Sequence, residues 1–479
     1  MKTIIKSSLY LFALATTIFS SCSDYLNVQP EDKIMETQLF STPQGIRSVL
    51  NGMYISLSGN ALYGDNMTLS TMDILAQRYN VPSTHNLNKI STYAYGDSPA
   101  SSRLETIWSN SYSLILNVNS FLENIDKYKG VLDAKTEAIY KGEALAIRAF
   151  MHFDLLRLYG PRYSTVDSTK QALPYYVNTQ NTINPLLPAN SFLDKVLEDL
   201  EHAEQLLAAD AIITNGVTSV GATTADNFVT ADRNYRLNYY AVLGLKARAY
   251  LYRGDKVNAL KYANLVIDVA DKFKWTTSAN ALSEKQNPDR VFSTEMIFGV
   301  LNTQLYSRYN SLFDPSITDK NILAPIESRL NTLYENNEND YRFNLNWAKP
   351  STGAKTYKVF LKYADIVDKE RTYRFTIPVL KISEMYYIAA ESEPAAATGI
   401  AKLNIVRANR GLLPLAATAN LTTELQKEYQ KEFFGEGQLF YYYKRRNVTS
   451  VANGSAASGN VTVNYNIPLP LSESQYRNN

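Results

Sequence analysis

Apolar side chains recur at helical spacing along most of the chain. Segment 102–126 carries them three and four positions apart, and segments 41–57 and 191–207 show the same amphipathic pattern. Pro43 near the start of the first turn and Ser191 as an N-cap are typical helix entries. The chain is therefore predicted to be mostly α-helical.

Segment 142–161, GEALAIRAFMHFDLLRLYGP, is apolar on two faces instead of one. Leu145 and Phe153 lie on one face, while Ile147 and Leu158 lie on another. A helix of this kind must pack against neighbours on both sides. The closing Gly-Pro pair stops it, because proline cannot continue a helix. The pattern predicts an inner helix in a stack of helical hairpins.

Two segments have the spacing of tetratricopeptide hairpins. In 236–270 the small, aromatic, turn and small positions are Ala247, Tyr250, Gly254 and Ala259. Segment 383–411 repeats the distance between the two small residues, with Ala389 and Ala401. Because long polar insertions separate the hairpins, we expect one closed scaffold and not an open solenoid.

The insertions are predicted to hold the few short strands and the irregular structure. They are 58–100, 160–190 and 276–377. Binding residues tend to lie in such loops on a rigid scaffold. A Gly-, Ser- and Asn-rich segment, 448–462, is predicted to be a flexible surface loop.

The first residues, 1–21, have the layout of a secretory signal peptide: two lysines, a short apolar run and small residues. Cys22 follows directly and is the only cysteine, so it cannot form an internal disulfide. We interpret it as a lipidation site. Residues 22–40 are then a lipidated tether, polar and extended over 23–33.

The mature protein is predicted to be one compact unit in two parts, 41–275 and 276–479. Its net charge of +2 and the lack of a basic block argue against nucleic acid as a partner. Tyrosine is abundant, with 35 Tyr against 18 Phe. Its flat apolar ring and polar tip suit contact surfaces as well as cores.

The sequence lacks the usual catalytic apparatus. His85, His152 and His202 are not paired at metal-binding spacing, and His152 fits a buried structural role. Neither a phosphate-binding glycine loop nor a nucleophile elbow is present, and 334–342 lacks the glycine of a calcium loop. We predict no catalytic residue, metal or cofactor.

Three carboxylates at a spacing of four residues could still suggest acid–base chemistry. Glu428, Glu432 and Glu436 would share one helical face, where like charges repel unless they are paired. The cations at 444–446 could supply partners. A structural ion network is therefore favoured over a catalytic pair.

Several segments together resemble the SusD/RagB family of outer-membrane nutrient-binding lipoproteins. They are Cys22 after the signal peptide, GEALAIRAFMHFDLLRLYG, RLNYYAVLGLKARAYLYRGD, IPVLKISEMYYIAAE, LNIVRANRG, EYQKEFFGEGQLFYYYKR and NIPLPLSESQYR. They occur in the family's order and span nearly the whole chain. The chain departs from the family's pattern at Tyr429 and Gln438, so the ion network is expected to be thinner.

The resemblance implies a mostly α-helical, tetratricopeptide-like fold without catalysis. It also implies a lipid-anchored protein of a Gram-negative outer membrane that faces the cell surface. There it would sit over a TonB-dependent (SusC-like) β-barrel transporter. The insertions would hold the nutrient, most commonly a glycan. Peptide or another nutrient is an open alternative as cargo. A glycosidase or a purely structural scaffold is a further alternative.

Ligand residues are predicted from their chemistry, because sugars stack on aromatic rings and hydrogen-bond to Asp, Asn and Arg. The candidates lie in two of the insertions, 58–100 and 276–377: Asp73, Arg78, Tyr79, Tyr93, Tyr95, Tyr306, Arg308, Tyr309 and Trp347. For each of them singly, a packing role is the stronger expectation.

Overall fold

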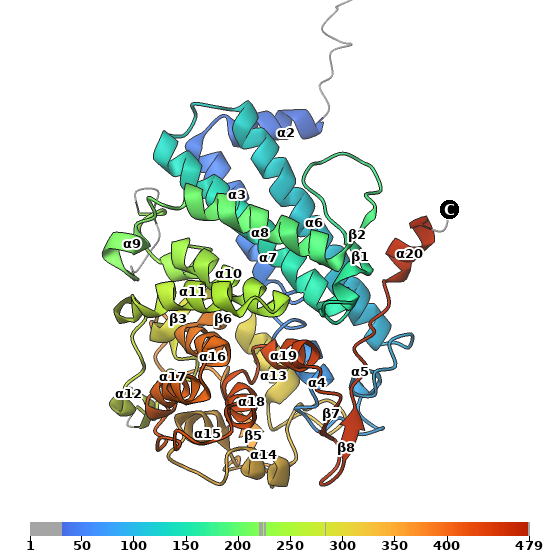
Figure 1. The fold of residues 1–479 in the computed structure, drawn as a ribbon, viewed down its shortest axis with the longest axis vertical. Coiled ribbons are helices and arrows are strands. Elements are labelled where there is room, and N and C mark those ends of the chain that lie inside the picture. The colour runs from blue at the N-terminus through green and yellow to red at the C-terminus, as the bar shows by residue number, and fades with distance from the viewer. Residues whose placement is uncertain (1–30, 220–223, 225–226, 283, 478–479) are drawn as a thin grey trace, which may run out of the picture.

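Helices dominate the structure, as predicted. The computed structural model describes residues 31–219, 224, 227–282 and 284–477. The predicted signal peptide and Cys22 lie outside the described residues. Figure 1 shows the long helices of the first half above and most helices of the second half below. In the described part of the chain, no helix is both long enough and apolar enough to cross a membrane.

The first half supplies the long helices. They are α2 (Glu31–Phe40), α3 (Pro43–Ser58), α6 (Ala100–Lys127), α7 (Ala134–Tyr159) and α8 (Ala189–Leu206). The Thr42 side chain caps α3 by accepting from Gly45 N, and Asp133 caps α7 through Thr136 N. These caps satisfy amide groups that have no partner within the helix.

Helix α2 corrects the prediction of an extended tether, because the chain is already helical at Glu31. Phe40 is buried against Phe121 and Tyr128, with ring centroids 6.0 and 5.9 Å away. Glu36 pairs with a lysine of α6 at 2.5 Å. The buried ring of Phe40 therefore packs the end of the predicted tether against α6.

Helix α7 occupies the inner position that its two apolar faces predict. It packs between α6 and α8, and Ala146, Ile147 and Leu156 are fully buried. The predicted start of α8 was wrong: the strand β2 ends at Pro188 and the helix begins at the next residue, so Ser191 lies inside the first turn.

The two predicted hairpins are confirmed. They are α10 (Tyr239–Arg253) with α11 (Lys256–Ile267), and α16 (Ile382–Ser392) with α17 (Ala396–Ala408). Gly254 turns the first hairpin with φ +86°, a conformation that favours glycine. Helix α10 packs on α8 and α11 packs on α16, so the helical stack continues from one half into the other (Figure 1).

The insertions contain short elements. The helices are α4 (Thr71–Leu75), α5 (Asn88–Ser91), α9 (Ile212–Asn215), α12 (Ser278–Leu282), α13 (Leu305–Phe313), α14 (Glu327–Leu333) and α15 (Tyr341–Asn346). The 3-10 turns are η2 (Asp167–Thr169), η3 (Arg233–Tyr235), η4 (Ala270–Lys272) and η5 (Ser293–Glu295). The strands are β1 (Gln171–Pro174), β2 (Leu186–Pro188), β3 (Met296–Leu301), β4 (Trp347–Ala348), β5 (Val359–Phe360) and β6 (Thr376–Lys381).

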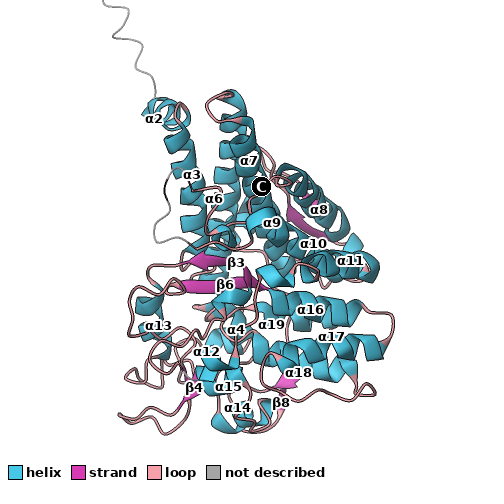
Figure 2. Ribbon diagram, turned by 90° about the vertical axis from the view of Figure 1, so that its left-hand side faces the viewer, coloured by secondary structure: helices cyan, strands magenta, loops and turns pink. Residues whose placement is uncertain are grey.

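Each strand has a single antiparallel partner: β1 with β2, β3 with β6, and β4 with β5. The pair β3–β6 is the longest, and Leu301 faces Thr376 at one end of its register. Figure 2 shows this pair crossing the middle of the molecule, between the upper helices and the irregular lower part.

The chain ends with α18 (Leu421–Glu432), α19 (Gln438–Arg446), the hairpin β7 (Ser450–Ala452) and β8 (Asn460–Thr462), and α20 (Leu471–Arg477). The hairpin corrects the prediction of a flexible loop at 448–462. Ser455 Oγ accepts from Val81 N at 2.9 Å, and a side chain on Gly454 would collide with the carbonyls of Gln77 and Tyr79. Close contact with residues far away in the sequence fixes this segment.

Candidate functional site

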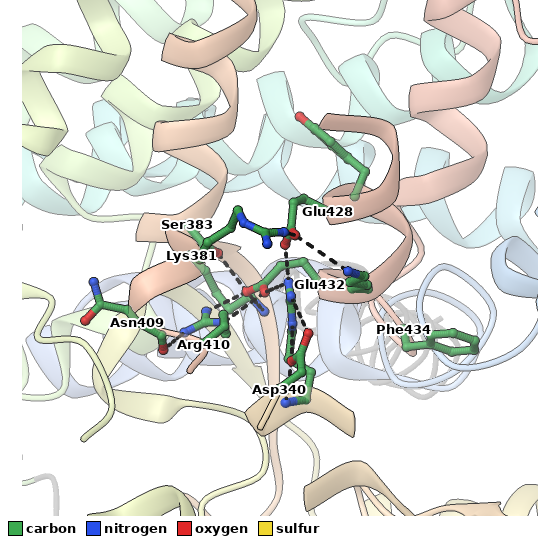
Figure 3. A network of polar contacts seen from close by, with 12 residues as sticks. Asp340, Lys381, Ser383, Asn409, Arg410, Glu428, Glu432 and Phe434 are labelled. Carbon is green, nitrogen blue, oxygen red and sulfur yellow. Dashed lines mark hydrogen bonds and ion pairs between the residues drawn. The ribbon is translucent and has the colours of Figure 1, made fainter. Parts of the chain in front are cut away.

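The three spaced glutamates form a buried ion network, but they do not share one helical face as predicted. Helix α18 ends at Glu432, and Glu436 lies beyond it, where it pairs with Lys362 and Lys381. Glu428 pairs with Arg342 and Arg407, each at 2.8 Å. Figure 3 shows Glu428 and Glu432 projecting from α18 toward cations of other segments. Their charges are thus compensated inside the protein.

Glu432 lies at the centre of this network. Its carboxylate contacts Arg410 at 2.7 Å, Lys381 at 2.9 Å and Arg342 at 3.1 Å. Burial opposes ionisation, but the cations, Arg410 foremost, hold the pKa of Glu432 well below its usual value. Because the carboxylate is closed off from solvent, its role is structural, as the sequence predicted.

Two further details of the prediction were wrong. The cations at 444–446 do not pair with these glutamates: Lys444 Nζ donates to the carbonyls of Leu158 and Gly160, and Arg445 binds Glu391. Nor is the network thin, because Arg342, Lys381 and Arg410 come from segments that the sequence did not connect with α18. Gln438 instead accepts from Arg157 at 3.1 Å.

The predicted structural role of His152 is confirmed. Its ring stacks on Tyr175 at 3.8 Å, and its Nδ1 lies 3.0 Å from the carbonyl oxygen of Arg148. Burial lowers the pKa of His152 well below its ordinary value, so the ring is neutral. Among the described residues, no group of His, Cys, Asp and Glu could hold a metal ion.

Several predicted ligand residues come together in one aromatic cluster. Tyr79 and Trp347 contact Phe434, with centroids 6.0 and 4.9 Å away, and Tyr309 joins through Phe313 at 5.8 Å. All three predicted aromatics are buried. In this structure they pack against other protein side chains, and ligand contact by them stays a prediction.

Asp73 and Arg78 belong to the same cluster. Asp73 is buried, accepts from Gly435 N at 2.7 Å and lies 3.6 Å from Arg78. Burial raises the pKa of Asp73 to about 6. The Arg78 guanidinium lies 4.0 Å above the ring of Phe434. Asp73 therefore positions Arg78.

The other four predicted residues also have protein partners. Tyr93 donates to the carbonyl of Leu75 at 3.1 Å, and Tyr95 donates to that of Asn464. Tyr306 Oη accepts from Phe375 N at 3.3 Å, while Arg308 pairs with Asp65. Ligand contact by these residues stays a prediction, and their present contacts are with protein.

A pocket of about 200 Å³ opens where Arg78 and Phe434 meet the C-terminal hairpin. We call it the hairpin pocket. It is lined by the turn after α4, by α14, by α18 and α19, and by the β7–β8 turn: Ala76, Gln77, Arg78, Pro325, Ile326, Arg329, Leu330, Thr332, Leu333, Gln430, Phe434, Leu439, Tyr443, Ala452, Asn453 and Gly454. Figure 1 shows these elements together in the lower part of the molecule.

The hairpin pocket combines an apolar floor with a polar rim. The largely buried rings of Phe434 and Tyr443 lie in this floor, and Figure 3 shows Phe434 pointing away from the ion network. Gln430 and Asn453 supply amides at the partly exposed edge. Apolar surface with a few convergent polar groups is typical of small-molecule sites.

Sequence reasoning found only Arg78 among the lining residues. Gln430 and Phe434 belong to a segment interpreted as scaffold, and Asn453 belongs to a segment interpreted as a free loop. The segment LFYYYKR gave a weak signal. Its consecutive aromatic residues are more than one buried face of a helix can accommodate, so they indicated aromatic surface on more than one side. No pattern in the sequence predicted that residues 452–454 would lie next to residue 77.

A larger concave surface lies on the helical side, and we call it the helix groove. Its volume is about 820 Å³, and its walls come from the end of α3, from segment 228–236 and from the end of β3. Arg236 is held there between the rings of Tyr54 and Phe228, at 4.5 and 4.2 Å. None of the predicted ligand residues lines it.

Comparison with known families gives two matches that cover most of the chain. Residues 24–225 match a SusD-like family described as "Starch-binding associating with outer membrane". Residues 277–479 match the SusD/RagB family, described as "SusD family".

Two curated relatives come from Formosa agariphila. SusD-like protein P38 is 23% identical over 286 residues, which are 56% of this chain and 46% of that relative. SusD-like protein P2 is 22% identical over 259 residues, 53% of this chain and 44% of that relative. The match thus spans less than half the length of each.

Solved structures share the fold over almost the whole chain. A SusD superfamily protein from Bacteroides thetaiotaomicron has a TM-score of 0.72 at 20% identity, covering 91% of this chain and 98% of that one. Surface glycan-binding protein A from the same species has a TM-score of 0.67 at 17% identity, covering 92% and 98%. At these identities the likeness establishes the fold.

Proposed function

The chain belongs to the SusD/RagB family, and from this premise we propose that it binds a glycan at the outer membrane and passes it to a transporter. The observation that carries the proposal is the hairpin pocket, with ring surface from Phe434 and Tyr443 below a rim of amides and guanidinium groups. Sugars present apolar faces and hydroxyls, so both kinds of surface have a counterpart on such a ligand.

The names of similar proteins support glycan as the cargo. Solved structures that share the fold include a SusD-like carbohydrate binding protein and surface glycan-binding proteins. The pocket is small, so it would hold one sugar unit of a longer chain. Peptide is the alternative cargo, because aromatic pockets with amides also accept peptide groups.

Delivery requires a lipid anchor at Cys22 and a TonB-dependent (SusC-like) barrel as partner. Both parts of the proposal come from the family resemblance. A stable lid on such a barrel would need an interface of the class above about 2,000 Å². The chain is expected to co-purify with this transporter in mild detergent, and recovery as a lone species under several gentle conditions would contradict the partnership.

The proposal is tested by calorimetry against a panel of neutral and acidic oligosaccharides and a peptide digest. We expect binding of at least one glycan, and no peptide binding. The double variant Asn453→Ala with Gln430→Ala should lose about tenfold in affinity, because each lost hydrogen bond costs about 0.5–1.5 kcal/mol. Both residues are partly exposed, so the thermal melt should change little.

The matched control is Leu301→Ala with Gln304→Ala, two exposed residues of the helix groove. It should leave affinity unchanged. Loss of binding in the control alone would move the site to the groove, and binding of peptides without glycans would change the cargo. Product analysis after long incubation tests for catalysis: turnover that disappears in Glu432→Gln would overturn the binding role.

A further inference from the structure

We infer that the hairpin pocket selects a negatively charged sugar, one that carries a carboxylate or a sulfate ester. The inference rests on the proposed function and adds the substrate class to it. Its basis is the charge of the lining: two arginines, Arg78 and Arg329, and no aspartate or glutamate among the described residues that line the pocket.

Arg329 is a cation without a carboxylate partner in the described part of the chain. Its Nε donates to the carbonyl of Ala456 at 3.0 Å, and its Nη2 donates to that of Gly459 at 2.7 Å. These neutral acceptors hold the side chain beneath the β7–β8 turn and leave its positive charge uncompensated. Nη1 donates no hydrogen bond to a described residue, so it is available to a ligand.

Arg78 is positioned but only weakly compensated. Its Nη1 donates to the carbonyl of Gln430 at 2.6 Å, and its ion pair with Asp73 is long, at 3.6 Å. Its Nη2 also lies 3.4 Å from the carbonyl oxygen of Tyr429, and its buried guanidinium is held on the ring of Phe434. The second cation of the pocket is therefore preorganised.

Two carboxylates on and directly after α14 are already engaged in ion pairs. Glu327 on α14 pairs with Lys349 at 3.2 Å, and Glu335 after α14 pairs with Lys427 and Lys431 at 3.3 and 3.5 Å. They do not line the pocket. Apart from the buried Asp73, which lies 3.6 Å from Arg78, neither arginine has a carboxylate partner among the described residues.

Carboxylates and sulfate esters suit this arrangement. A guanidinium binds the two oxygens of a carboxylate, or those of a sulfate, through parallel charge-assisted hydrogen bonds. The aromatic floor would contact the apolar face of the same sugar ring. A neutral sugar would satisfy the floor but would leave the charge of Arg329 uncompensated.

The test measures affinity for matched pairs of oligosaccharides. The probes are fragments of polygalacturonate, alginate and glucuronoxylan, each with its carboxyl-reduced form, and a sulfated galactan fragment with its desulfated form. We expect one acidic member to bind at least about tenfold tighter than its neutral partner, because hydrogen bonds to charged groups are the stronger ones. That preference should shrink as salt is added. The carboxylate and sulfate arms distinguish the two sources of charge.

Three variants assign the preference to the pocket. Arg329→Gln should abolish the acidic preference, Arg329→Lys should retain part of it, and the exposed control Arg371→Gln should not change it. Thermal melts of all three report on the fold. Equal loss for acidic and neutral members in both Arg329 variants would mean that this arginine only clamps the hairpin, which overturns the inference.

Two further outcomes separate this inference from the proposed function. Binding of neutral glycans without an acidic preference would overturn the inference and leave glycan binding intact. Failure of every oligosaccharide to bind would overturn both.

Discussion

At the scale of single residues, burial of a charged side chain shifts its pKa. Lys444 is buried and donates to the carbonyls of Leu158 and Gly160, at 2.8 and 2.7 Å. These carbonyls end α7, where the helix dipole favours a cation. Burial nevertheless lowers the pKa of Lys444 from 10.5 to about 7.

This shift predicts a pH dependence of stability. Between pH 7 and about 10 the unfolded chain binds a proton at Lys444 that the folded chain does not, so the free energy of unfolding should rise with pH across this range. Lys444→Met removes the titrating group and should flatten the rise. Urea unfolding at pH 7, 8 and 9 measures it. The exposed control Lys195→Met should keep the wild-type slope, and an unchanged slope in Lys444→Met would contradict the prediction.

At the scale of elements, the ion network joins α18 to segments that meet it only in the folded chain. Glu432 on α18 binds Lys381 at the end of β6, Arg410 after α17 and Arg342 in α15. Removal of one member leaves buried cations without a counter-charge, which costs more than the pair itself contributes.

Glu432→Gln should therefore lower the free energy of unfolding by about 3–5 kcal/mol at neutral pH. The folded pKa of Glu432 lies well below its ordinary value, so its contribution is present above about pH 5 and is lost as the pH falls through that folded pKa. Chemical unfolding at pH 7 measures the loss. Glu198→Gln, which removes an exposed ion pair with Lys195, should change stability by less than about 0.5 kcal/mol. Comparable losses in the two variants would refute a special role for the network.

At the scale of the whole molecule, one helical stack supports the irregular insertions, and the C-terminal segment packs against them. The main apolar core runs from Phe40 to Ile467, and so includes residues of both halves. The hairpin pocket lies between the insertions and the C-terminal segment, where α14 meets the β7–β8 turn. Under the proposed function, the stack provides rigidity and this pocket provides the binding surface.

The proposed anchor predicts where the whole protein resides. Cys22→Ala should release it from membranes, because two or more acyl chains are needed for stable attachment. Detergent partitioning and metabolic labelling with a fatty acid measure this, with Ser23→Ala as the control. Continued labelling of the Cys22→Ala variant would exclude lipidation at this residue.

The sequence by itself determined the helical frame. Apolar spacing predicted α3, α6 and α7 and the two hairpins, because a helix records its buried face in residues three and four positions apart. The two apolar faces of α7 even indicated neighbours on both sides. The pairing of glutamates in a structural network was also predictable, because like charges on one helix face need counter-charges.

The tertiary structure alone decided the partners and the pocket. Arg342, Lys381 and Arg410 meet α18 from three separate segments, and no local pattern specifies such contacts. Gln77 and Gly454 lie next to each other although 377 residues separate them in the chain. Trp347 and Tyr443 are both buried aromatic residues, but only Tyr443 lines the hairpin pocket. Only the packing of distant segments determines which ring becomes support and which becomes binding surface.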